Sequence, residues 1–109
     1  MTAKAYDVLR VAAGEIGYSR WTDPEEGTKY GRWYAEGHGA YFGADGVPFC
    51  AMGGAWALAQ VGMEPPVGAF AYVPAGINAA RAAGRLVPIH NAQAGDLVCF
   101  DWDDDGEAD

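Results

Sequence analysis

One cysteine, Cys50, stands where a helix is expected to begin. Residues 47–49 (VPF) lead into it, and a nearly all-apolar run follows over residues 51–61. Proline suits a helix entrance, and Gly62 suits the end of that helix. The positive end of a helix stabilises a thiolate, which is the nucleophilic form of cysteine, and free N–H groups in the first turn can hold an oxyanion. Cys50 is therefore a candidate nucleophile, and the alternative is a small buried apolar residue.

The acidic end of the chain carries a second chemical pattern. Residues 101–106 (DWDDDG) match the D-x-D-x-D-G opening of a calcium-binding loop. The candidate ligands are Asp101, Asp103, Asp105, Glu107 (through its carbonyl) and Asp109. The bidentate glutamate that closes such a loop would fall beyond Asp109, so the site is incomplete within these residues. Calcium is the expected cofactor, no organic cofactor is expected, and a solvated acidic turn is the alternative.

Aromatic residues form the candidate substrate groove. The segment 28–34 (TKYGRWY) is dense in tyrosine and tryptophan, and an aromatic residue also precedes Cys50. The candidate substrate-binding residues are Tyr30, Trp33, Tyr34 and Phe49. Mixed aromatic and polar lining suits a saccharide or peptide groove. The alternative is that these rings belong to the core, since tyrosine and tryptophan are usually well buried.

Composition limits the classes of partner. The chain has 109 residues, enough for one domain, and 15 acidic against 7 basic residues give a net charge of −8. Nucleic acid and anionic membranes need a basic surface, so neither is expected as a partner. Two cysteines are too few for a disulfide scaffold, and we see no signal peptide or membrane span. These features predict synthesis in the cytoplasm.

The apolar pattern predicts the elements that position these residues. Helical spacing favours a helix over residues 3–15, a central buried helix over 50–61 and a short helix over 77–83. Residues 28–34 are expected as a short helix or a loop. Residues 91–96 read as a turn. The run 97–100 (LVCF) is expected as a buried strand, with Cys99 in a packing role.

Three blocks of sequence, in order, resemble the CHAP family of cysteine- and histidine-dependent amidohydrolases/peptidases. The blocks are residues 28–34, residues 47–52 (VPFCAM) with Trp56, and residues 95–98 (GDLV) with 100–102 (FDW). The resemblance implies an α+β, papain-like fold, with N-terminal helices, including a central Cys-bearing helix, packed on a small antiparallel sheet. It also implies that Cys50 cleaves amide bonds in bacterial peptidoglycan, as an amidase or endopeptidase of a phage endolysin or bacterial autolysin. The chain departs from the family pattern at Phe49, where tryptophan is usual, and at Cys99, where an aromatic or aliphatic residue is usual.

The histidine that the family pairs with its cysteine has no counterpart here. His38 and His90 do not match its position, which would follow Asp109. Residues 1–109 are therefore expected to be a single, partial catalytic domain without its C-terminal strands, inactive alone and acting on the cell wall after release. A second chain or self-association would complete the sheet. The alternative is a non-catalytic fragment, or a calcium- or wall-binding module that requires a partner chain.

Overall fold

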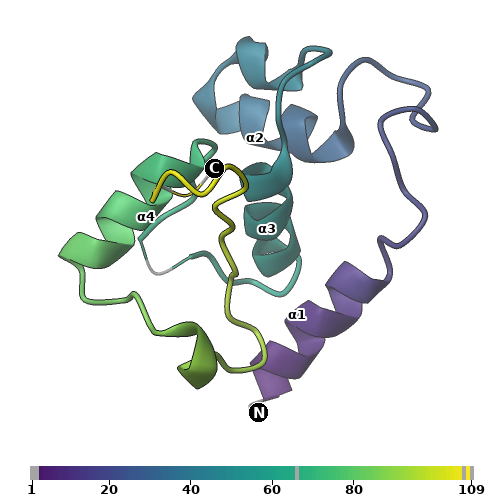
Figure 1. Ribbon diagram of the computed structural model, residues 1–109. Helices are drawn as coiled ribbons and strands as arrows, with labels where there is room; N and C mark the ends of the chain where they lie inside the picture. Colours follow the sequence, from purple (N-terminus) through teal and green to yellow (C-terminus); the bar gives the residue numbers. More distant parts are fainter. Residues whose placement is uncertain (1–2, 66, 107, 109) are drawn as a thin grey trace.

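Every regular element in the described part of the chain is helical. The computed structural model describes residues 3–65, 67–106 and 108. The elements are α1 (Ala3–Ala13), α2 (Lys29–His38), the 3-10 helix η1 (Ala40–Gly43), α3 (Cys50–Ala59), α4 (Val73–Ala82) and the 3-10 helix η2 (Ile89–Asn91). Figure 1 shows α3 at the middle, with the C-terminal segment running past it. None of the helices in the described ranges is long and apolar enough to cross a membrane.

The expected α+β, papain-like fold with its antiparallel sheet is wrong. Within the described ranges no strand occurs, and residues 97–100 form no backbone hydrogen bond with a neighbouring segment. Leu97, Val98 and Phe100 are each about half exposed instead of buried. A strand depends on a pairing partner, and a short apolar run cannot supply one by itself.

The predicted helices agree with the structure more closely than the predicted strand does, because helices depend on local sequence signals. The helices expected over 3–15 and 50–61 are confirmed as α1 and α3, each ending about two residues early. Residues 28–34 open α2, where the Thr28 hydroxyl accepts a hydrogen bond from the Gly31 amide at 3.1 Å. The helix predicted over 77–83 is α4, which begins at Val73, four residues before the predicted start. Pro74 occupies its first turn.

The core is built on α3. One buried cluster joins α3 to α1, and a second joins α3 to α2. The first contains Val8, Ala57 and Leu58, and the second contains Tyr30, Tyr34 and Met52. The Trp56 side chain packs against both clusters, so α3 connects the two halves of the core.

A lysine of α2, surrounded by aromatic rings, joins the loop after α1 to α3. The Lys29 ammonium pairs with the Glu15 carboxylate and lies 4.7 Å from the ring centroid of Tyr18 and 4.9 Å from that of Trp56. The Tyr30 hydroxyl donates to the same carboxylate at 2.7 Å. The hydrogen bond from Lys29 is the main reason that the pKa of Glu15 is lowered, while burial and then Glu15 raise the pKa of Tyr30.

Asp23 fixes the loop before α2. Its Oδ2 accepts hydrogen bonds from the Tyr18 hydroxyl and, at 2.7 Å, from Arg32, and its Oδ1 accepts one from the Glu25 amide. Only 4% of the Asp23 side chain is exposed. These donors, Tyr18 first, lower the pKa of Asp23 to about 2. The ionised carboxylate therefore holds the loop against α2.

Replacing Asp23 by asparagine should reveal this carboxylate as a pH-dependent stabiliser. A carboxylate whose pKa is lower in the folded than in the unfolded protein stabilises the fold above its unfolded value, near 3.8, and this contribution disappears as the pH falls towards about 2. The urea midpoints of wild type and Asp23→Asn should therefore differ by a constant amount between pH 6 and 8, and converge between about pH 4 and 2. A difference that stays constant down to pH 2 would contradict this assignment.

Candidate active site around Cys50

Cys50 is the first residue of α3, and its thiol is exposed. The residue before it, Phe49, lies at φ −128° and ψ 9°, and no side chain caps this end of the helix. The first turn of a helix has N–H groups without helical partners, and here no side-chain oxygen competes for them. If the Cys50 sulfur attacks a carbonyl carbon, the oxyanion formed on the carbonyl oxygen could therefore accept hydrogen bonds from the backbone of the same turn.

An arginine from the N-terminal loop holds the turn that presents Cys50. The Arg20 guanidinium donates to the Val47 carbonyl at 3.2 Å and lies 5.1 Å from the centroid of the Phe49 ring. On α2, the Tyr30 ring stacks with Phe49 at a centroid distance of 5.8 Å. Sequence reasoning missed Arg20, because nothing local links it to a turn 27 residues further on. It adds a permanent positive charge beside the turn before Cys50.

The four predicted substrate-binding aromatics lie at different depths. Tyr30 and Tyr34 are core residues, 8% and 7% exposed, whereas Trp33 and Phe49 are half-buried. All four belong to the cluster around Met52. Burial leaves the two tyrosines little surface for a ligand and agrees with the alternative of a core role. Phe49, next to the cysteine, keeps the best position to contact a substrate.

Neither histidine is held near Cys50 by a described contact. The His38 ring stacks on Tyr34 at a centroid distance of 3.8 Å, and its Nδ1 lies 2.9 Å from the Tyr34 carbonyl oxygen. His90 lies in η2 and is exposed. No hydrogen bond or ion pair in the described part of the chain joins either imidazole to Cys50. The structure therefore assigns no general base to this thiol.

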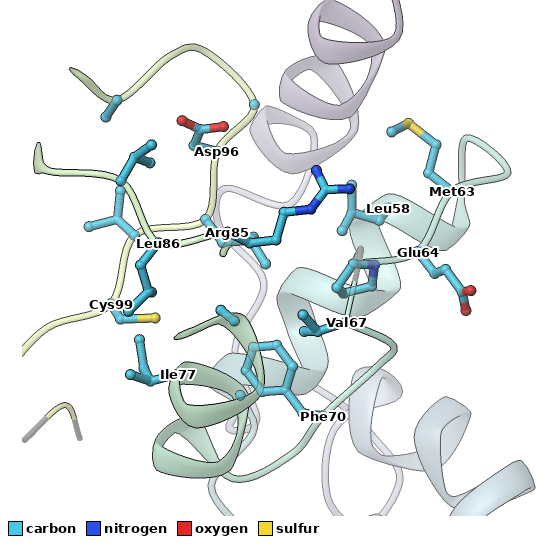
Figure 2. Close-up of a pocket in the computed structure, with 18 of the residues that line it drawn as sticks. Leu58, Met63, Glu64, Val67, Phe70, Ile77, Arg85, Leu86, Asp96 and Cys99 are labelled. Atoms are coloured by element: carbon cyan, nitrogen blue, oxygen red, sulfur yellow. The ribbon is translucent and has the colours of Figure 1, made fainter. Parts of the chain in front are cut away.

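An open cavity of about 490 Å³ lies between α3, α4 and the C-terminal segment. Its walls are mostly apolar, and include Leu58 of α3, Ile77 of α4 and Phe70. Figure 2 shows the Arg85 side chain reaching into this space, with Cys99 at its edge. Cys99 was predicted to be buried in a strand, but its thiol is exposed.

The structure brings three of the predicted metal ligands together. One carboxylate oxygen from each of Asp101, Asp103 and Asp105 lies within 4.8 Å of the others. Two calcium ligands on opposite sides of the ion are separated by about twice the 2.3–2.6 Å bond length, so this spacing fits a calcium ion. The other two predicted ligands, Glu107 and Asp109, lie outside the described residues.

Backbone hydrogen bonds already close this acidic loop. The Asp101 carboxylate accepts the amides of Gly106 at 2.8 Å and Asp105 at 3.2 Å. Loss of hydration alone would raise the pKa of Asp101, but these hydrogen bonds outweigh it and the pKa is lowered. The backbone turns through Asp104 at φ +58° and Gly106 at φ +88°. Asp101 therefore organises the loop in addition to being a candidate ligand.

Comparison with known proteins supplies no family for this arrangement. The chain matches no protein-family model, no curated protein and no solved structure. The CHAP resemblance consequently rests on the residues of this sequence alone.

Proposed function

We propose that this chain is the cysteine-bearing part of a peptidoglycan hydrolase, an amidase or endopeptidase that acts through Cys50. The observation that carries the proposal is the exposed thiol at the uncapped start of α3. The proposal does not need the sheet of the papain-like fold. It needs a thiolate, donors for the oxyanion and a base.

Two of these three requirements have a source in the described residues, and the base does not. The Cys50 thiolate would attack the carbonyl carbon of the scissile amide, and the backbone N–H groups at the start of α3 would receive the charge on its oxygen. Collapse of this intermediate expels the amine and leaves an acyl group on sulfur, which water then hydrolyses. A free thiol is only a few per cent ionised at neutral pH, so proton transfer requires a histidine that reaches Cys50. Because no described contact supplies that histidine, we expect this chain alone to be inactive.

Release of soluble fragments from purified peptidoglycan, with calcium present, tests the proposal. The assay would compare residues 1–109 with a form carrying the residues expected to follow Asp109, and would include Cys50→Ser in both. We expect hydrolysis from the longer form only, with a loss of at least about a thousandfold in its Cys50→Ser variant. Hydrolysis that survives Cys50→Ser would refute the role of this thiol. Hydrolysis by residues 1–109 alone would refute the expectation that these residues supply no base for Cys50.

We also propose that the acidic loop binds calcium and supports the active site structurally. Replacing Asp103 by alanine removes one of three converging carboxylates, so calcium affinity measured by titration calorimetry should fall by about tenfold or more. The matched control is Asp104→Asn, because Asp104 lies outside the three-carboxylate cluster and asparagine tolerates its positive φ. Equal affinities for Asp103→Ala and wild type would remove the loop as the calcium site.

A further inference from the structure

The two cysteines of this chain belong to segments that pack on each other. A Cβ atom placed on Gly54 would lie 3.3 Å from Leu97 Cδ2, so the Leu97 side chain rests on α3 at that glycine. Figure 1 shows the C-terminal segment running past α3 towards the end where that helix begins. Residues 96–100 contain neither a turn nor a bend, so the segment passes α3 as an extended chain.

The geometry of a helix and of an extended chain brings the two thiols to the same level. Cys50 precedes Gly54 by four residues, which places both on one face of α3 with a rise of about 6 Å between them. Cys99 follows Leu97 by two residues, about 6.6 Å along an extended chain, and both residues line the neighbouring cavity. From the contact between Leu97 and Gly54, α3 leads back to Cys50 and the C-terminal segment leads on to Cys99, and both run towards the first turn of α3. Cys99 therefore arrives opposite Cys50.

The surroundings of the two thiols leave room for a reaction between them. Both thiols are free and exposed, so a small oxidant can reach them. The lining of the neighbouring cavity includes Cys99, which gives its side chain room to change rotamer.

We propose that Cys50 and Cys99 form a reversible intramolecular disulfide, which makes this pair a site of oxidative modification. The oxidant is a small-molecule disulfide such as oxidised glutathione. The Cys50 thiolate attacks one sulfur of the oxidant, forms a mixed disulfide and releases one glutathione thiolate. The Cys99 thiolate then attacks Cys50 Sγ and releases the second. The two cysteine protons end on the two glutathione molecules, so one disulfide is reduced for each one formed.

One consequence rests on the proposed function. A Cys50 sulfur held in a disulfide has no thiolate with which to attack a peptide bond, so the bond would switch off the candidate nucleophile until a thiol reductant restores it. The disulfide itself does not depend on hydrolase activity, so the two proposals can fail separately.

Peptide mapping after oxidation tests the pair. The folded chain would be treated with oxidised glutathione, blocked with iodoacetamide and digested with trypsin, which cuts after Arg81 and Arg85 between the two cysteines. We expect an intact mass lower by two hydrogen atoms, with no adduct, and a peptide pair held together through Cys50 and Cys99. The variants Cys50→Ser and Cys99→Ser should each keep one glutathione adduct.

The unfolded chain provides the matched control. In concentrated urea the cross-link should form at least about tenfold more slowly, because the fold no longer holds the thiols together. Two stable glutathione adducts on the folded wild type, a disulfide-linked dimer, or equal rates with and without urea would overturn the proposal. A cross-link in a chain whose extended form hydrolyses peptidoglycan without needing Cys50 would refute the proposed function and leave the disulfide standing.

Discussion

Gly31→Ala is expected to destabilise the protein by about 2 kcal/mol, although alanine is the better helix former. An added Cβ atom would lie 2.3 Å from the carbonyl oxygen of Phe42 in η1, a backbone atom that cannot rotate away. Overpacking of this kind costs about 3 kcal/mol, and the gain in helix propensity returns about 1 kcal/mol. The unfolding free energy from urea titration measures the net effect.

Gly37, in the same helix, provides the matched control. A Cβ atom there would meet nothing within 4 Å, so Gly37→Ala should stabilise the protein by up to about 1 kcal/mol. Identical chemistry at two positions of α2 should thus change stability in opposite directions. If both variants are stabilised, α2 and η1 do not pack as closely as the structure shows.

Met52→Ala is expected to have an effect of at least this size. Met52 is 0% exposed, lies in the cluster with Tyr30 and Tyr34, and follows Cys50 by two residues in α3. Truncating a fully buried methionine to alanine leaves a cavity and costs about 3 kcal/mol. Urea titration should show the loss as a lower midpoint, without a change in slope.

The conservative variant separates loss of packing from any specific need for methionine. Met52→Leu keeps most of the side-chain volume and should cost less than about 1.5 kcal/mol. A loss in Met52→Leu as large as in Met52→Ala would mean that shape, and not buried volume, sets the energy of this cluster. A loss below about 1 kcal/mol in Met52→Ala would mean that the site collapses around alanine.

Local sequence signals predicted the helices but not the arrangement of the C-terminal third. Cys50 was placed at the start of α3 because proline, an apolar run and a glycine follow one another along the chain. Whether Leu97 enters a strand depends on which segment lies beside it, and no local pattern contains that information. In the structure its neighbour is Gly54 of α3, so the apolar run 97–100 packs partly on a helix instead of pairing with another strand.

The same distinction between local patterns and contacts of distant segments applies to the candidate site. Asp101, Asp103 and Asp105 were predicted to converge because alternate residues of one short loop can face a common point, and the structure confirms their proximity. The contact of Arg20 with Phe49 joins distant parts of the chain and was not predicted. From its sequence Tyr30 was a candidate groove residue with a core role as the alternative, and its burial favours the core role.

The exposed C-terminal segment has a consequence for hydrogen exchange. Apart from Gly95, every residue from 83 to 100 is exposed, whereas α3 carries the buried core. The segment can therefore leave α3 by a sub-global opening that breaks few apolar contacts, and amides in α3 itself exchange only when the core opens. A covalent bond from Cys99 to the start of α3 would couple these two events. Protection would then extend from the most stable helix into the least stable part of the chain.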